Sequence, residues 1–222
     1  MPRYAISDIH GCHQTFLHLL DEIHFSKTDE LFLLGDYIDR GPDSYGVIQT
    51  ILRLQDTGHT IHCLRGNHEQ MMLDALDSID GEVYRLWLRN GGNTTIHSIR
   101  DRDSDALLRW MDALPYHLES PGYLMVHAGL QFGFDPLQDT RAMLWKRDWY
   151  DQIDHEWLDG RIILHGHTPM AHTEIRRMLE RVPQKRVLDL DAGCVFTHRA
   201  KYGRLCAFNM DERELTFVEK MD

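Results

Sequence analysis

Short groups of aspartate, histidine and asparagine recur along the chain, each directly after a run of apolar residues. The groups are Asp8-Ile9-His10-Gly11, Gly35-Asp36-Tyr37-Ile38-Asp39-Arg40-Gly41, Arg65-Gly66-Asn67-His68-Glu69, His127-Ala128-Gly129 and His165-Gly166-His167-Thr168. Their side chains offer hard or borderline oxygen and nitrogen donors, which suit divalent metal ions. One such group is more often a turn than a ligand pair, but repetition beside glycine is hard to explain by packing. Together the groups predict a metal site assembled from several segments.

The apolar runs that precede these groups have the length and composition of strands. Strand candidates are residues 4–6, 31–34, 60–64, 123–126, 162–164, 187–190, 205–208 and 215–218. Between the early runs, apolar residues recur at helical spacing, as at Phe16, Leu19, Leu20 and Ile23. This alternation predicts α/β layering, and α/β folds place ligand sites at the carboxyl ends of strands. The last two runs predict an antiparallel hairpin.

The segment after the third strand candidate has a different character. From Glu69 to Leu114 the apolar spacing is helical, and a Gly91-Gly92-Asn93 turn interrupts it. This pattern predicts a helical insertion, roughly residues 69–118, that caps the sheet. The 222 residues suit a single domain that spans 1–222.

Charge and hydropathy exclude several classes of partner. Lys and Arg number 24 and Asp and Glu number 35, so the formal net charge is −11, the wrong sign for attraction to nucleic acid or an anionic membrane. No run approaches the roughly 18 apolar residues of a membrane span, and the first residues lack the apolar core of a signal peptide. A cytoplasmic location is therefore expected. The 4 cysteines form no CxxC pair, which favours reduced, buried thiols.

Taken in order, the segments SDIHG, GDYIDRG, GNHE, HAG and GHT resemble the motifs of the phosphoprotein phosphatase family of calcineurin-like metallophosphoesterases. The resemblance is strongest to the small bacterial and phage members, extends over residues 3–210, and includes a DAGCVF segment similar to the closing strand of that family. It implies a β-sandwich flanked by helices, in α/β/β/α layers, with a small helical insertion.

The resemblance also implies two divalent metal ions. Its ligands would be Asp8 and His10 for the first ion, Asp36 as a bridge, and Asn67, His127 and His167 for the second. Manganese is the expected metal, and iron and zinc are alternatives because the same donors suit all three. Two such ions activate a water for in-line attack on phosphorus, so no protein nucleophile is required.

Further roles follow from the same resemblance. Arg40, Arg65 and Arg147 would hold the substrate phosphate, whose oxygens match the fork of a guanidinium group. His68, paired with Asp39, would protonate the leaving group as general acid.

The chain departs from the family pattern at two positions. Ser7 replaces a glycine that is common in the first motif, and His165 precedes His167 by two residues. Two residues apart on a strand, both histidines face the same side. A supporting role and core packing both remain open for His165.

The substrate is less strongly indicated than the reaction. GDYIDRG and GNHE resemble the protein serine/threonine phosphatase branch, so a phosphorylated protein or peptide is the leading substrate, with phosphotyrosine acceptance open. The alternative is a symmetrical diadenosine tetraphosphate hydrolase, whose first motifs and Arg-Gly-Pro at 40–42 are similar. A binding module that has lost catalysis is disfavoured, because all six ligands and His68 are present. A monomer is expected.

Overall fold

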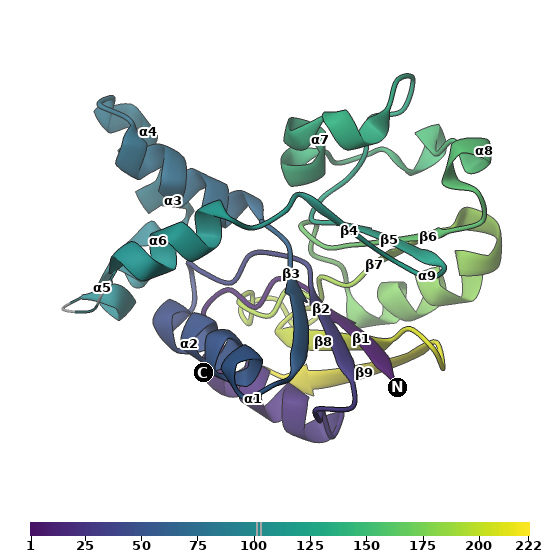
Figure 1. Ribbon diagram of the computed structural model, residues 1–222, viewed down its shortest axis with the longest axis horizontal. Helices are drawn as coiled ribbons and strands as arrows, with labels where there is room; N and C mark the ends of the chain where they lie inside the picture. Colours follow the sequence, from purple (N-terminus) through teal and green to yellow (C-terminus); the bar gives the residue numbers. More distant parts are fainter. Residues whose placement is uncertain (101, 103) are drawn as a thin grey trace.

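Two β-sheets form the centre of the computed structural model, which describes residues 1–100, 102 and 104–222 (Figure 1). The first sheet has the strand order β3-β2-β1-β8-β9, with β1 at Arg3–Ile6, β2 at Glu30–Leu33, β3 at Thr60–Cys63, β8 at Arg204–Asn209 and β9 at Glu214–Glu219. The second has the order β4-β5-β6-β7, with β4 at His117–Ser120, β5 at Tyr123–Val126, β6 at Ile162–His165 and β7 at Val187–Asp189.

The two sheets bury their facing sides against each other. Because side chains alternate along a strand, Ala5 of β1 lies in the core between the sheets and Ile6 lies on the outer face. Phe208 of β8 and Leu164 of β6 both belong to this shared core, although they come from different sheets. The apolar strands are therefore buried on both faces, as their near-continuous apolar runs predict.

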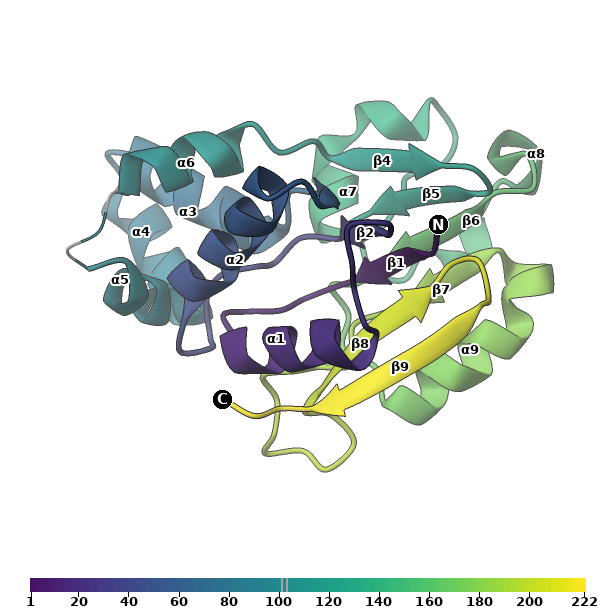
Figure 2. The same cartoon turned by 60° about the horizontal axis from the view of Figure 1, so that its bottom comes forward.

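Helices cover the outer faces of both sheets (Figures 1 and 2). On the first sheet lie α1 at His13–Glu22 and α2 at Ser44–Asp56. On the second lie α7 at Thr140–Trp145 and α8 at His155–Leu158, with the short turns η2 at Pro136–Gln138 and η3 at Tyr150–Gln152. The longer α9, His172–Lys185, packs against β7 and adds Ile175 and Val182 to the core between the sheets. The predicted α/β/β/α layering is confirmed.

Between β3 and β4 the described residues form only helices and turns. They are α3 at Asn67–Asp77, α4 at Gly81–Trp87, the turn η1 at Leu88–Gly92, α5 at Asn93–Ile99 and α6 at Ser104–Asp112. Figure 1 shows these helices together on one side of the sheets, apart from α7, α8 and α9. Residues 101 and 103, within the helical segment expected from the sequence, lie outside the described residues.

Every strand predicted from the sequence is present, and β8 and β9 form the expected antiparallel hairpin. The strand β4 was missed, because its residues are mixed polar and apolar and only partly buried at the edge of the sheet. All 4 cysteines are free and buried, as expected. Among the described residues, no helix has both the length and the apolar character that a membrane crossing requires.

Candidate metal centre and active site

The predicted site residues converge where strands of the two sheets end. β1, β2 and β3 run parallel, and so do β5, β6 and β7, so that each set ends at one edge of its sheet. The first sheet supplies the groups around Asp8, Asp36 and Asn67, and the second supplies those around His127 and His167. The site is therefore built at the edge of the sandwich by both sheets.

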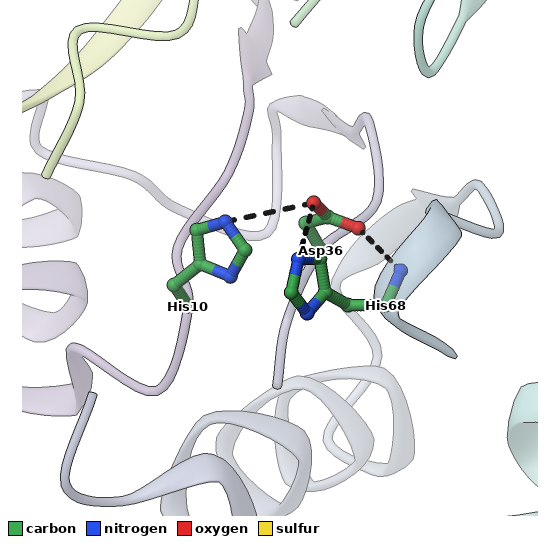
Figure 3. A group of neighbouring side chains, drawn as sticks. All are labelled: His10, Asp36 and His68. Carbon is green, nitrogen blue, oxygen red and sulfur yellow. Dashed lines mark hydrogen bonds and ion pairs between the residues drawn. The ribbon is translucent and has the colours of Figure 1, made fainter. Parts of the chain in front are cut away.

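Asp36 lies at the centre of this cluster. Its Oδ2 atom is 3.5 Å from Nε2 of His10 and 4.0 Å from Nε2 of His68, and Figure 3 shows both imidazole rings close to this carboxylate. Its Oδ1 atom is 3.5 Å from Nε2 of His127. Asp36 consequently belongs to both groups of side chains that could hold a metal, one with His10 and His68 and one with His127 and His167. This is the arrangement expected of a carboxylate between two cations.

The remaining predicted ligands complete the two groups. Asn67 places its Oδ1 atom 2.9 Å from Nε2 of His127 and 2.8 Å from Nδ1 of His167. On the other side, Asp8 Oδ1 is 3.9 Å from Nε2 of His10, while Asp8 Oδ2 accepts the backbone N–H of His167 at 3.0 Å. All six predicted metal ligands are thus brought together.

Hydrogen bonds orient two of the histidines as metal ligands require. A backbone carbonyl can only accept, so Nδ1 of His10 donates to Ile38 at 2.9 Å and Nδ1 of His127 donates to Leu34 at 2.8 Å. In each ring the Nε2 lone pair is then directed into the cluster. Metal-binding histidines are commonly held in this way.

The centre also contains two imidazole nitrogens, Nε2 of His127 and Nε2 of His167, that accept no hydrogen bond from within the cluster. With Nδ1 of His127 protonated, its Nε2 and the facing Oδ1 of Asn67 are both acceptors at 2.9 Å. Nε2 of His167 is buried and has no hydrogen-bond partner. A cation shared by these atoms would remove the unfavourable contact, so the donor set fits divalent metal ions.

Burial sets the protonation of the cluster. It raises the pKa of Asp36 well above its ordinary value, and the nearby Asp8 carboxylate raises it further. Burial lowers the pKa of His10 and His167, which favours the neutral rings that metals bind. Buried carboxylates among neutral imidazoles form an environment that favours bound cations.

The backbone of the site is strained. Asp8, Asp36, Asp39 and His167 have φ values of 49°, 57°, 69° and 73°, in the left-handed region that residues other than glycine seldom adopt. Such outliers cost about 1–3 kcal/mol each and cluster at functional sites. Here the left-handed backbone conformation of these four residues directs their side chains toward one another.

Glu69 holds this strained backbone in place. Its Oε2 atom accepts the N–H groups of Asp36 and Gly66, each at 2.9 Å. Its Oε1 atom accepts those of Tyr37 at 2.8 Å and Ile38 at 3.3 Å. A Cβ atom on Gly66 would lie 2.2 Å from Oδ1 of Asp36, so only glycine allows the two loops to approach so closely.

His68 and Asp39 form a buried pair beside the centre. Nδ1 of His68 lies 2.7 Å from Oδ2 of Asp39, which leaves Nε2 on the side of Asp36. Burial raises the pKa of Asp39 to about 7. The carboxylate also accepts the indole N–H of Trp87, at 3.0 Å to Oδ2, and the hydroxyl of Thr95, at 2.6 Å to Oδ1. The pair is therefore tied to the helices between β3 and β4.

The three predicted arginines are placed differently. Arg40 reaches the centre, where its Nη1 donates to Nε2 of His10 at 2.8 Å. Arg147 is exposed and bonds Thr168, next to His167, through Nη1 at 3.2 Å. Arg65 is buried, and its guanidinium group donates hydrogen bonds to Gln70 on α3, to Asp112 at the end of α6 and to Tyr116.

A scan against family models identifies residues 1–202 as a calcineurin-like phosphoesterase. The chain belongs to this family. Over 219 residues, 91% of both chains, it is 31% identical to serine/threonine-protein phosphatase 1 of Salmonella typhimurium. The family expected from the sequence motifs is thereby confirmed.

A second group of relatives has a different name. The chain is 37% identical over 131 residues to the symmetrical bis(5'-nucleosyl)-tetraphosphatase of Nitrosomonas europaea. These residues make up 59% of this chain and 45% of that enzyme. Further enzymes of this name match at similar identity. The chain thus spans less than half the length of these relatives. The crystal structure of a putative diadenosine tetraphosphatase has the same fold, with a TM-score of 0.68 and 20% identity over 100% of this chain and 94% of that chain.

Some contributors to the phosphoesterase site were not predicted. Asp191, in the DAGCVF segment, is buried, and the Asp8 carboxylate adds to the effect of burial in raising its pKa. Trp87 and Thr95 flank the Gly-Gly-Asn turn, and this turn was the only sequence feature that pointed to a contribution from these two residues. His165 lies behind the site, where its nitrogens are 2.9 Å from the Gly166 carbonyl and the Tyr150 hydroxyl.

The contacts of Glu69 yield a test of stability. A glutamine at this position has one acceptor oxygen and turns an NH₂ group toward backbone donors. We expect Glu69→Gln to lower the free energy of unfolding of the metal-free protein by about 2–4 kcal/mol, because each buried donor left unpaired costs about 1–3 kcal/mol. Urea denaturation measures this, with the exposed Glu22→Gln on α1 as control. A loss below about 0.5 kcal/mol would contradict the assigned contact.

The central position of Asp36 yields a second test. Adding Mn²⁺ to chelator-treated protein should raise its melting temperature, since a ligand at 100 times its Kd stabilises the folded state by about 2.7 kcal/mol. The shift should nearly vanish in Asp36→Asn, which weakens both ligand groups. The exposed Asp21→Asn is the matched control. An equal Mn²⁺ shift in Asp36→Asn would refute the placement of Asp36 in the metal centre.

Proposed function

We propose that this calcineurin-like phosphoesterase is a metal-dependent phosphomonoesterase that acts on protein phosphoserine and phosphothreonine. Its two divalent cations, with manganese as the expected metal, would be held by the six residues that converge on the sandwich edge: Asp8, His10, Asp36, Asn67, His127 and His167. When bound, the cations supply a nucleophilic water and offset the charge of the phosphate.

The buried His68–Asp39 pair is the observation that carries the proposal. A serine or threonine alkoxide is a strong base and leaves only when it is protonated, whereas weaker bases leave unaided. With both ring nitrogens protonated, Nδ1 of His68 donates to Asp39 at 2.7 Å, and Nε2, on the side of Asp36, carries the proton that passes to the leaving alkoxide. A dedicated acid of this kind is most useful for an alkyl phosphate ester.

Two arginines can position the phosphate in this scheme. Arg40 already directs a guanidinium N–H to Nε2 of His10, and Arg147 lies at Thr168 beside His167. Arg40 lies in the loop after β2 and Arg147 in the loop after α7, one beside each ligand group, and both would bind phosphate oxygens as bidentate donors. Arg65 would need to release Gln70 or Asp112 to do the same.

Symmetrical hydrolysis of a dinucleoside tetraphosphate is the second candidate. Several curated relatives carry this name, and their local identity, at 34–37%, is higher than the 31% of the protein phosphatase of Salmonella typhimurium. A protein phosphatase matches over nine tenths of both chains, which is why we place the phosphomonoester first. The leaving group distinguishes the two, because a nucleoside diphosphate is a much weaker base than an alkoxide.

The role of His68 predicts a dependence on the leaving group. We expect His68→Asn to lower kcat on a phosphothreonine peptide by about 10²- to 10⁴-fold, the usual contribution of a general acid. On p-nitrophenyl phosphate the loss should be much smaller, since p-nitrophenolate needs little protonation. Steady-state kinetics of both substrates with Mn²⁺ measure this ratio. Equal losses on the two substrates would refute the general-acid role.

Direct comparison of substrates tests the order of the two candidates. The wild-type protein with Mn²⁺ should turn over the phosphothreonine peptide with a higher kcat/KM than diadenosine tetraphosphate, because its acid serves a poor leaving group. Phosphate release and nucleotide chromatography measure the two reactions. A clear preference for the dinucleotide would reverse the order.

A further inference from the structure

The carboxylate of Asp39 is clamped from three sides. Oδ2 faces Nδ1 of His68 at 2.7 Å, and Oδ1 accepts the Thr95 hydroxyl at 2.6 Å. The indole N–H of Trp87 spans both oxygens, at 3.0 Å from Oδ2 and 3.2 Å from Oδ1. Rotation of the carboxylate would break at least one of these bonds.

The backbone of Asp39 is held by Thr95 of α5 and by Ser44 of α2. Its N–H points to the Thr95 hydroxyl at 2.9 Å and to the Ser44 hydroxyl at 3.1 Å, and these two hydroxyls are 3.0 Å apart. The φ of Asp39 is 69°, so the residue needs such support to stay in place. Asp39, Thr95, Trp87 and His68 are each 1% exposed or less, which strengthens these hydrogen bonds and leaves no room for water to replace them.

The turn η1 joins the two clamping residues. A Cβ atom on Gly92 would lie 2.4 Å from the Trp87 ring, so the turn packs directly on the indole. The carbonyl of Gly91 accepts the N–H of Arg40 at 3.3 Å. The Gly-Gly-Asn turn thus brings Trp87 and Thr95 to Asp39 and also contacts the backbone of the adjacent arginine.

We propose that Trp87 and Thr95 are positioning residues, through which the helices between β3 and β4 set the orientation of the general acid. They touch neither the proposed ligands nor the reacting atoms. By holding Asp39 in one rotamer, they keep the His68 ring turned so that Nε2 faces the reacting bond. The inference rests on the proposed role of His68, and its effect is confined to substrates whose leaving group needs a proton.

The test is a double-mutant cycle read with two leaving groups. Thr95→Val keeps the shape and removes the hydroxyl. We expect it to lower kcat on a phosphothreonine peptide by about tenfold to a hundredfold, the range that loss of a hydrogen bond to a charged group allows. On p-nitrophenyl phosphate the loss should be several times smaller. In the His68→Asn background, Thr95→Val should cause no further loss on the peptide.

Three further variants separate a loss of the hydrogen bond from a loss of folding. Thr95→Ser should restore most of the peptide activity, and Trp87→Phe should reproduce the selective loss if Thr95→Val does not fold. Trp110→Phe on α6, whose ring packs on Tyr37 at 5.3 Å, is the matched control and should leave both activities unchanged. Equal losses on both substrates, or a further peptide loss in the His68→Asn background, would overturn the positioning role. An absence of selectivity in His68→Asn itself would overturn the proposed general acid instead.

Discussion

A carboxylate buried among other carboxylates is the constraint on which the rest of this structure depends. Asp36 lies between two sets of imidazole nitrogens, with Asp8 and Asp191 nearby, and burial raises the pKa of Asp36 and Asp191. A buried charge without compensation is costly, so this arrangement favours bound cations. Hydrogen bonds to backbone carbonyls orient the rings of His10 and His127, and Glu69 accepts the backbone N–H of Asp36. The ligands are therefore held in position before a cation binds.

The chain divides the proposed chemistry between two parts of the fold. The parallel strands of both sheets deliver the metal ligands, whereas the helices between β3 and β4 reach the acid pair through Trp87 and Thr95. The two parts meet at the loop that carries Asp36, Asp39 and Arg40.

Most strands and the metal ligands that follow them could be predicted from the sequence, because a buried strand is visible as a short apolar run. Five of the eight apolar runs lead into a group with metal-binding residue types, and parallel strands bring such ends together. The edge strand β4 had no such signal, since its partly exposed residues alternate poorly. The left-handed backbone at Asp8 and Asp39 is a tertiary property that no residue type reveals. The contact of Trp87 with Asp39 is another, because it spans 48 residues of chain and depends on how η1 packs. The ion pair of Arg65 with Asp112 could not be predicted either, because the two residues are far apart in the sequence.

The number of metal ions bound per chain tests the central claim most directly. Isothermal titration of chelator-treated protein with Mn²⁺, checked by elemental analysis after gel filtration, should give two ions per chain. Substitution of Asp36 by asparagine should lower that number or weaken both sites together, because this carboxylate is shared. A single ion in the wild-type protein, or two ions bound with unchanged affinity after the substitution, would contradict a centre bridged by Asp36.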